Sequence, residues 1–205
     1  MKFDKRFIKQ LLIVIIATLC VGICILDFLY AALGSDSLTV FEEGLSKALH
    51  TSIGNGAIIY NVSSLVLDLI FFRKNIGWTT IVNALGVGVS VNIAEPLLLP
   101  FLTLSSSLPF RILLFVLGMI FCCVGCALLI YGKAGMSTLD ALCTGIGELI
   151  KVPYRYVRIA ADALLLISGY LMGGVVGVGS VFAMLLTGPL ISSLADLFRK
   201  YLPEL

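Results

Sequence analysis

Charged residues are scarce in this sequence. Only 13% of its 205 residues are charged, whereas 60% are hydrophobic. Soluble domains carry about a quarter charged residues, so this composition excludes an ordinary water-soluble fold. The net charge of +2 is also too small to indicate a nucleic acid partner, because proteins that bind nucleic acids present strongly basic surfaces.

Histidine is scarcer still. The only one, His50, ends an amphipathic stretch and is expected to be solvated. The sequence contains no Ser-His-Asp set, no H-E-x-x-H motif and no phosphate-binding loop. We therefore expect a protein that is not an enzyme and that holds no cofactor and no metal.

Cysteines are few and lie mostly in apolar runs. Two pairs have the i,i+4 spacing that a metal site could use, but no histidine or carboxylate accompanies either pair. Cysteine also serves as a small apolar packing residue, and we favour that interpretation for all six: Cys20, Cys24, Cys122, Cys123, Cys126 and Cys143.

Long apolar runs make up most of the chain. A membrane-spanning helix needs roughly 20 mostly apolar residues. Five runs are long enough. The last of them, 159–195, contains one charge, Asp162, and has room for two spans around the turn-like segment 173–179. The sequence thus predicts six spans in a single membrane domain, 1–205, surrounded by a lipid bilayer. The other four runs are 11–33, 53–72, 76–102 and 112–132.

Basic residues mark the connections expected on the cytoplasmic side of a membrane. Four of them precede the first run, and the second connection, the fourth connection and the C-terminal tail are also basic. The first connection, 34–52, is net acidic, and the fifth is uncharged. This alternation predicts a multi-pass protein of the bacterial plasma membrane with both termini in the cytoplasm.

The two halves of the chain resemble each other. Residues 34–50 align without a gap with residues 135–151, and the same offset places Asn61 on Asp162. After a slip of one residue, 76–92 aligns with 176–192. The alignment gains weight because glycines match at Gly34/Gly135, Gly44/Gly145, Gly77/Gly177 and Gly88/Gly188.

The repeat unit contains three spans and one amphipathic stretch. Because three is odd, the second copy must cross the membrane upside down, as in many transporter folds, where the functional site lies between the copies. The predicted fold is an all-α polytopic membrane protein with two inverted three-span repeats, approximately 8–102 and 109–203.

Each repeat contains a short amphipathic stretch, 34–50 or 135–151. In the second, Ser137 is positioned to cap a helix, and Asp140 follows three residues later. Such a helix could lie flat in the membrane interface with its apolar face in lipid. It could instead be re-entrant, with its N-terminus at a central cavity and its backbone shielded by protein or water. The sequence leaves both arrangements open.

The motifs of the second copy, "GMSTLDALCTGI" and "GVGSVFAMLLTGPLI", are matched by weaker ones in the first, "GSDSLTVFEEGL" and "GWTTIVNALGVGV". Together they resemble the YczE/YyaS/YitT group of bacterial integral membrane proteins. The chain departs from that pattern in the first copy, where Thr39 replaces the acidic residue and Val89 the proline. The resemblance implies a multi-pass plasma-membrane protein and implies no substrate.

Polar residues inside the apolar runs are candidates for a substrate cavity, because burying them in a membrane costs free energy. Asn61 and Asp162 occupy equivalent positions of the two copies and would approach the axis that relates them. Asn83 has no charged neighbour in its run, and Asp140 lies in the second amphipathic stretch. The alternative is that these four residues make interhelical hydrogen bonds, worth about 0.6 kcal/mol each.

Four further residues are weaker candidates. Arg158 is four residues before Asp162, so an ion pair along one helix face is available. Asp27 lies near the end of its run, and Glu95 precedes a helix-breaking proline, so each could reach a membrane surface. Asp68 is expected at the interface because Arg73 and Lys74 follow it closely.

Two functions fit these features best. The first is a small transporter or exporter with a small molecule or an ion as substrate. The second is a membrane subunit or assembly protein that binds a substrate and works with separate energising partners, whether further copies of the chain or other subunits. A membrane enzyme ranks last because no catalytic set is present.

Overall fold

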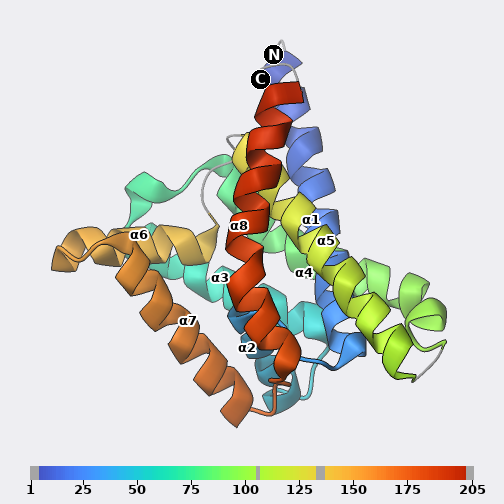
Figure 1. Cartoon of the computed structure of the whole chain (residues 1–205). Coiled ribbons are helices and arrows are strands. Elements are labelled where there is room, and N and C mark those ends of the chain that lie inside the picture. The colour runs from blue at the N-terminus through green and yellow to red at the C-terminus, as the bar shows by residue number, and fades with distance from the viewer. Residues whose placement is uncertain (1–4, 105–106, 133–136, 202–205) are drawn as a thin grey trace.

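The computed structural model describes residues 5–104, 107–132 and 137–201, and within these ranges it is entirely helical (Figure 1). The all-α class is therefore confirmed. One short 3-10 helix, η1 (Arg73–Asn75), separates α3 from α4. The α-helices of the described residues are α1 (Lys5–Ala31), α2 (Ser37–Ala48), α3 (Ile53–Phe71), α4 (Trp78–Leu102), α5 (Leu108–Tyr131), α6 (Thr138–Ile150), α7 (Tyr154–Leu171) and α8 (Val178–Tyr201).

Five of these helices are long and apolar enough to cross a membrane: α1, α3, α4, α5 and α8. Four of the six predicted spans thus correspond to single helices, and the fifth run divides into α7 and α8. Helix α7 begins five residues before Ile159, so its 18 residues include Arg155, Arg158 and Asp162. Those three charges keep α7 outside the set of five.

Local sequence signals set the ends of the short helices. Asp36 caps α2 by accepting a hydrogen bond from the backbone N–H of Thr39, and Ser137 caps α6 by accepting one from that of Asp140. Side-chain acceptors at the N-cap satisfy N–H groups that have no partner within the helix. The predicted start of the second amphipathic helix at Ser137 is therefore confirmed.

The long helices pack through an apolar centre between α1, α4 and α5. Leu26, Val91 and Leu114 are among the buried residues of this cluster, one from each helix. Helix α8 packs on α5. In Figure 1, α1 begins and α8 ends at the same end of the molecule, while α1 and α5 run in opposite directions.

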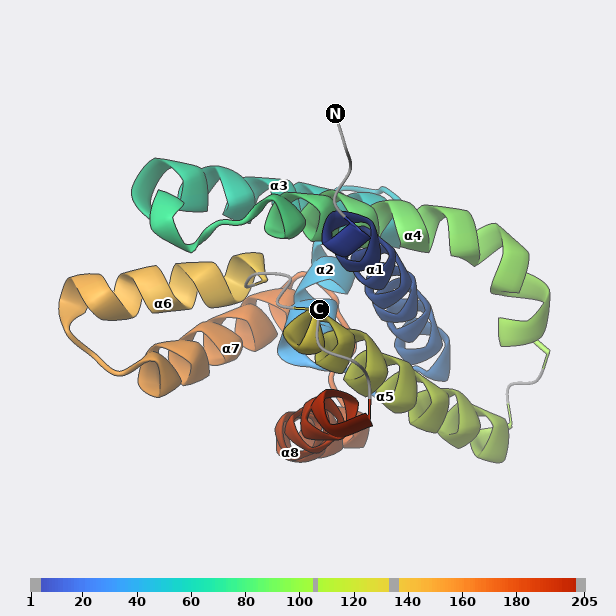
Figure 2. The same ribbon diagram turned by 90° about the horizontal axis from the view of Figure 1, so that it is seen from above.

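The short helices each pack against the other half of the chain. Helix α2 lies against α3 and α7, and α6 lies against α7 and α3. Seen from above, α6 and α7 form a hairpin beside the antiparallel pair α3 and α4 (Figure 2). The two connected hairpins α2–α3 and α6–α7 thus meet in the middle of the protein.

A glycine motif holds the turn before α2 against the start of α8. Gly34 has a positive φ of 94°, which favours glycine. The backbone N–H of Gly179 donates to the carbonyl of Leu33 at 2.8 Å. A methyl group on Gly177 or Gly179 would overlap the Leu33 carbonyl. The G-x-G-S motif at 177–180 therefore serves close backbone packing.

Candidate polar site at the starts of the two short helices

Each short helix begins with an acidic side chain and a hydroxyl three residues apart, and the order of the two differs between the helices. In α2 the carboxylate comes first, and the Thr39 hydroxyl donates to Asp36 Oδ1 at 2.7 Å. In α6 the hydroxyl comes first, and Ser137 donates to Asp140 Oδ2 at 2.7 Å. Asp36 aligns with Ser137 and Thr39 with Asp140 in the repeat, so each helix begins with one acid and one hydroxyl. The apparent loss of the acidic residue at Thr39 is thus offset by Asp36.

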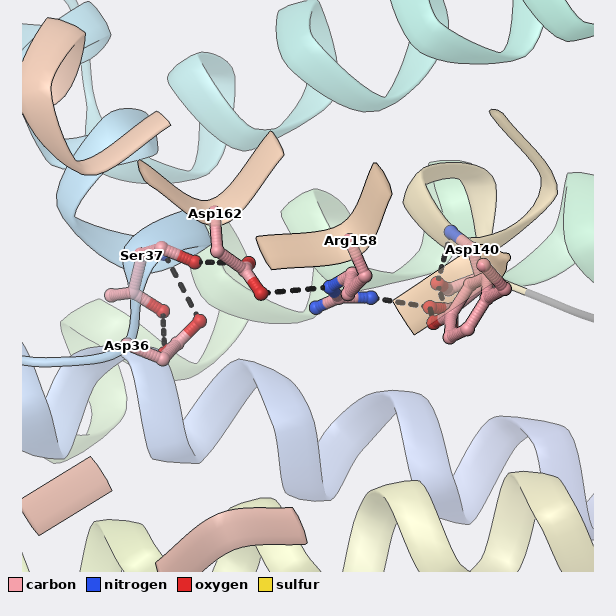
Figure 3. Close-up of polar contacts among 8 residues, drawn as sticks. Asp36, Ser37, Asp140, Arg158 and Asp162 are labelled. Carbon is pink, nitrogen blue, oxygen red and sulfur yellow. Dashed lines mark hydrogen bonds and ion pairs between the residues drawn. The ribbon is translucent and has the colours of Figure 1, made fainter. Parts of the chain in front are cut away.

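A chain of polar contacts links these two helix starts through α7 (Figure 3). The Ser37 hydroxyl donates to Asp162 Oδ1 at 2.6 Å. Arg158 Nε donates to the other Asp162 oxygen at 3.0 Å, and its Nη1 pairs with Asp140. The Tyr154 hydroxyl donates to Asp140 Oδ1 at 2.6 Å. One guanidinium therefore joins two carboxylates from different helices, with geometry suited to charge-assisted hydrogen bonds.

A second polar link joins α6 to α3 and α2. The Thr138 hydroxyl donates to Asn61 Oδ1 at 3.2 Å, and the Asn61 amide donates to Glu42 Oε1 at 3.2 Å. All three side chains are buried. Ser37 and Thr138 are aligned residues, and so are Asp162 and Asn61. Each short helix therefore uses its first residue to contact the equivalent position of the other half.

The charges of this site are predominantly negative. Asp140 and Asp162 share one guanidinium, that of Arg158, and Asp36 adds a third carboxylate at the start of α2. The side chains are partly accessible, at 31% for Arg158, 35% for Asp140 and 24% for Asp162. In contrast, Glu42 is 1% exposed, and burial raises the pKa of its carboxyl to about 8. The nearby Asp36 raises that pKa further, whereas the hydrogen bond from Asn61 lowers it.

The structure brings together three of the four main cavity candidates and one secondary candidate. Asp140 and Asp162 share the Arg158 guanidinium, and Asn61 reaches the same helix start through Thr138. Asn83 lies on α4, where its Oδ1 is buried without a hydrogen-bond partner in the described residues. Asn61, Asp140 and Asp162 thus make interhelical contacts near the starts of the short helices, as the alternative interpretation expected, and their place in a substrate cavity stays a prediction.

The remaining secondary candidates lie elsewhere. Asp27 is buried in α1, and its Oδ2 has no partner among the described residues. Glu95 on α4 accepts a hydrogen bond from Tyr30 at 3.3 Å. Asp68 is fully buried, while Arg73 and Lys74 are exposed, and its expected place at the membrane interface stays a prediction.

Sequence reasoning missed several polar residues of the site, among them Glu42, Asp36 and Tyr154. An available signal was the density of polar residues at 35–43, which exceeds what a lipid-facing helix tolerates. Across the described residues, no group of three metal-ligating side chains is close enough to hold an ion. All six cysteines are free, and Cys24, Cys123 and Cys143 are buried.

Comparisons with known proteins agree with the resemblance noted in the sequence. An uncharacterised protein of Bacillus subtilis, YyaS, is 23% identical over 186 residues, which cover 88% of this chain and 92% of that protein. An uncharacterised protein of Haemophilus influenzae is 25% identical over 171 residues, covering 83% and 76% respectively. No solved structure matches. A family model described as "Family of unknown function (DUF6198)" matches residues 8–196, and the chain therefore belongs to this family.

Proposed function

We propose that this protein is a small-solute transporter or exporter, and that its site lies between two inverted three-span copies. The observation that carries the proposal is the exchanged pair of contacts at the helix starts. Ser37 of the first half bonds Asp162 of the second, and Thr138 of the second half bonds Asn61 of the first. Contacts exchanged in this way are expected around a twofold axis that relates the copies.

The packing of whole helices supports the same axis. Helix α2 packs on α7 as α6 packs on α3, and α1 packs on α4 as α5 packs on α8. Helices α1 and α5, which begin the two copies, pack on each other in opposite directions (Figure 1). Helix α1 starts and α8 ends at the same end of the molecule (Figure 1). This arrangement fits an even number of membrane crossings, which requires α7 to be a sixth span beside the five long apolar helices.

Burial along the short helices supports the re-entrant arrangement. In α2 the buried residues run from Ser37 to Ser46, and exposure begins at Lys47. In α6 burial again covers the N-terminal part, and residues from Glu148 onward are exposed. A helix lying in the interface would instead show burial along one face over its whole length. The partial positive charge of each helix start therefore faces the protein interior.

The two halves differ where transport requires a moving part. Helices α3 and α4 pack closely, and a methyl group on Gly88 would overlap Ile58 and the Gly54 carbonyl. The corresponding helices α7 and α8 are not a closely packed pair in the described residues and diverge in Figures 1 and 2. Gly188 aligns with Gly88, but a methyl group added to it would meet no described atom within 4 Å. We infer that α7 and α8 of the second copy are in an open arrangement, and that they can close on each other as α3 and α4 of the first copy do.

The net negative charge of the polar side chains at the two helix starts indicates which class of solute the site would bind. Two carboxylates share a single guanidinium, and a third acid, Asp36, caps the neighbouring start of α2, so an added positive group gains favourable Coulomb energy there. The helix starts offer N–H dipoles to a negative group. A cation or a zwitterion is the solute class that this combination fits.

The test uses the purified chain in lipid nanodiscs with defined probes. Glycine betaine represents zwitterions, putrescine cations and acetate anions. A bound solute raises the unfolding temperature because it stabilises the folded state. We expect stabilisation by betaine or putrescine and none by acetate. Asp162→Asn should abolish it, whereas Glu148→Gln, an exposed carboxylate of α6, should leave it unchanged. Stabilisation that survives Asp162→Asn would refute the site.

Flux distinguishes a transporter from a partner-dependent subunit. Proteoliposomes containing only this chain should accumulate the probe that gives stabilisation. Stabilisation without flux would favour the alternative function, a substrate-binding subunit or assembly protein that needs separate energising partners.

A further inference from the structure

A row of buried polar side chains runs along one face of α3. Asn61, Ser64 and Asp68 are spaced at i, i+3 and i+7, which places them on one helix face. All three are buried, and Asp68 is fully inaccessible. Seven residues of helix rise by about 10 Å, so the row extends well away from the Arg158 ion pairs. Glu42 of α2 joins it through its hydrogen bond with Asn61.

Several oxygens of this row have no partner. Within the described residues, both carboxylate oxygens of Asp68 and Oε2 of Glu42 make no hydrogen bond, whereas the Ser64 hydroxyl lies within reach of the Tyr60 hydroxyl. Burying an ionised carboxylate without a partner is so unfavourable that such groups bind a proton instead. These unpartnered atoms indicate two carboxyl groups that are neutral in this arrangement.

Among the described residues, Glu42 takes part in no ion pair. The titratable side chains that interact with it are Asp36 of its own helix start and Tyr60 of α3. Arg158 of α7 interacts with Tyr60, and Asp162 of α7 bonds Ser37 at the start of α2. Asp36 is acidic, and the Arg158 guanidinium is shared between Asp140 and Asp162. Glu42 therefore faces acids and neutral groups.

Asp68 is in a similar position against α6. Burial raises the pKa of the Cys143 thiol of α6 to about 11, and Asp68 is among the carboxylates that raise it further. The Arg73 and Lys74 side chains of the neighbouring η1 are exposed. The one acidic residue of α4, Glu95, is bonded to Tyr30 of α1. Asp68 aligns with Gly169 of the second copy, so this carboxyl has no acidic counterpart there.

We propose that Glu42 and Asp68 each carry a proton in this arrangement and form the proton-coupling site of the protein, between α2, α3 and α6. A proton suits the site better than a metal ion, because one carboxyl oxygen suffices to hold it, whereas an alkali ion requires several oxygen ligands. Coupling requires a second arrangement in which water reaches the row, so that each carboxylic acid ionises by releasing its proton to water. The protonation itself is independent of the proposed function, whereas its role in coupling rests on it.

Infrared difference spectroscopy on the nanodisc sample tests the protonation without any solute. Protonated carboxyl groups give a carbonyl stretching band that is separate from the carboxylate bands and shifts in D2O. We expect such a band at neutral pH in the wild type. Wild type minus Asp68→Asn and wild type minus Glu42→Gln should each isolate one component, and the Glu42 component should disappear as pH rises through its pKa of about 8. Glu148→Gln should leave the band unchanged.

The coupling is tested with the probe that the binding assay identifies, in proteoliposomes with and without a pH gradient. The gradient should increase wild-type uptake, and Asp68→Asn should remove that increase. Absence of the protonated band in the wild type, a result that needs no variant to fold, would overturn the proposal and leave the proposed function standing. A band that each of the two variants reduces, without any flux, would refute the proposed function and retain the two protonated carboxyls. Flux that ignores the gradient would refute the coupling.

Discussion

Replacing Gly169 by alanine should loosen the contact between α2 and α7. A Cβ at this position would lie 2.7 Å from the backbone N and Cα of Phe41 and 2.7 Å from the carbonyl of Val40. All three atoms belong to the α2 backbone, which cannot rotate out of the way as a side chain can. The two helices must therefore move apart, and Ser37 must draw away from Asp162.

The magnitude follows from two opposing effects. Overpacking a close contact destabilises by typically about 1–3 kcal/mol. Alanine gains up to about 1 kcal/mol of helix propensity over glycine, but Gly169 lies near the end of α7, where that gain is smaller. We expect a net destabilisation of about 1–2 kcal/mol.

Gly188→Ala is the matched control, because it makes the same chemical change in a helix where no described atom lies near the added methyl group. It should leave the stability unchanged or raise it by up to about 1 kcal/mol. Thermal unfolding of both variants in nanodiscs gives the comparison. If Gly169→Ala is as stable as Gly188→Ala, the close packing of α2 on α7 is refuted.

Three further predictions concern movement, pH and charge. Ile159 and Gly188 align with Ile58 and Gly88, which are in contact in the first copy. Cysteines at 159 and 188, on a cysteine-free background, should therefore crosslink only when α7 and α8 close on each other, and an added solute should increase their crosslinking. Unchanged crosslinking would contradict this closure. The pKa of Glu42 is raised from 4.5 to about 8 on folding, so the folded state binds more protons than the unfolded state between these values. The stability of the protein should therefore fall as pH rises through this window. Thermal unfolding at several pH values should show this slope in the wild type and a flatter slope in Glu42→Gln. Arg158→Gln should destabilise the folded protein by about 1–3 kcal/mol, because it leaves two partly accessible carboxylates without their cation. The control Arg199→Gln breaks an exposed pair and should cost less than about 1 kcal/mol. Equal effects of the two variants would contradict the role of the Arg158 ion pairs.

Much of the architecture could be predicted from the sequence because its signals are local. Apolar runs give the long helices, and Ser137 marks the start of α6. The repeat alignment places Asn61 and Asp162 at equivalent positions, and each contacts the other half. The start of α7 differs from the predicted one because Arg155 and Arg158 interrupt the apolar run, whereas the helix continues through them.

The density of polar residues at 35–43 argues against a lipid-facing helix, but the direction in which the polar face of α2 points could not be predicted from local pattern. An amphipathic helix in water buries its apolar side, but in a membrane protein the polar side can turn inward while lipid covers the rest. Glu42 and Glu43 are buried for that reason. Glu43 pairs with Lys47 at 2.6 Å and accepts the backbone N–H of Val175 at 2.9 Å. The contact with Val175 spans more than 100 residues of sequence, and only the tertiary fold brings its two partners together.

The sidedness of the two short helices decides whether the two copies are inverted. His50 follows α2 and Lys151 follows α6; the two residues are equivalent in the repeat, and both are exposed. Single cysteines at these positions, on a cysteine-free background, can be labelled in intact cells with a membrane-impermeant maleimide. We expect position 50 to react from outside and position 151 to react only after the membrane is opened. Labelling of both positions from the same side would contradict two inverted copies, and with them a site between the copies.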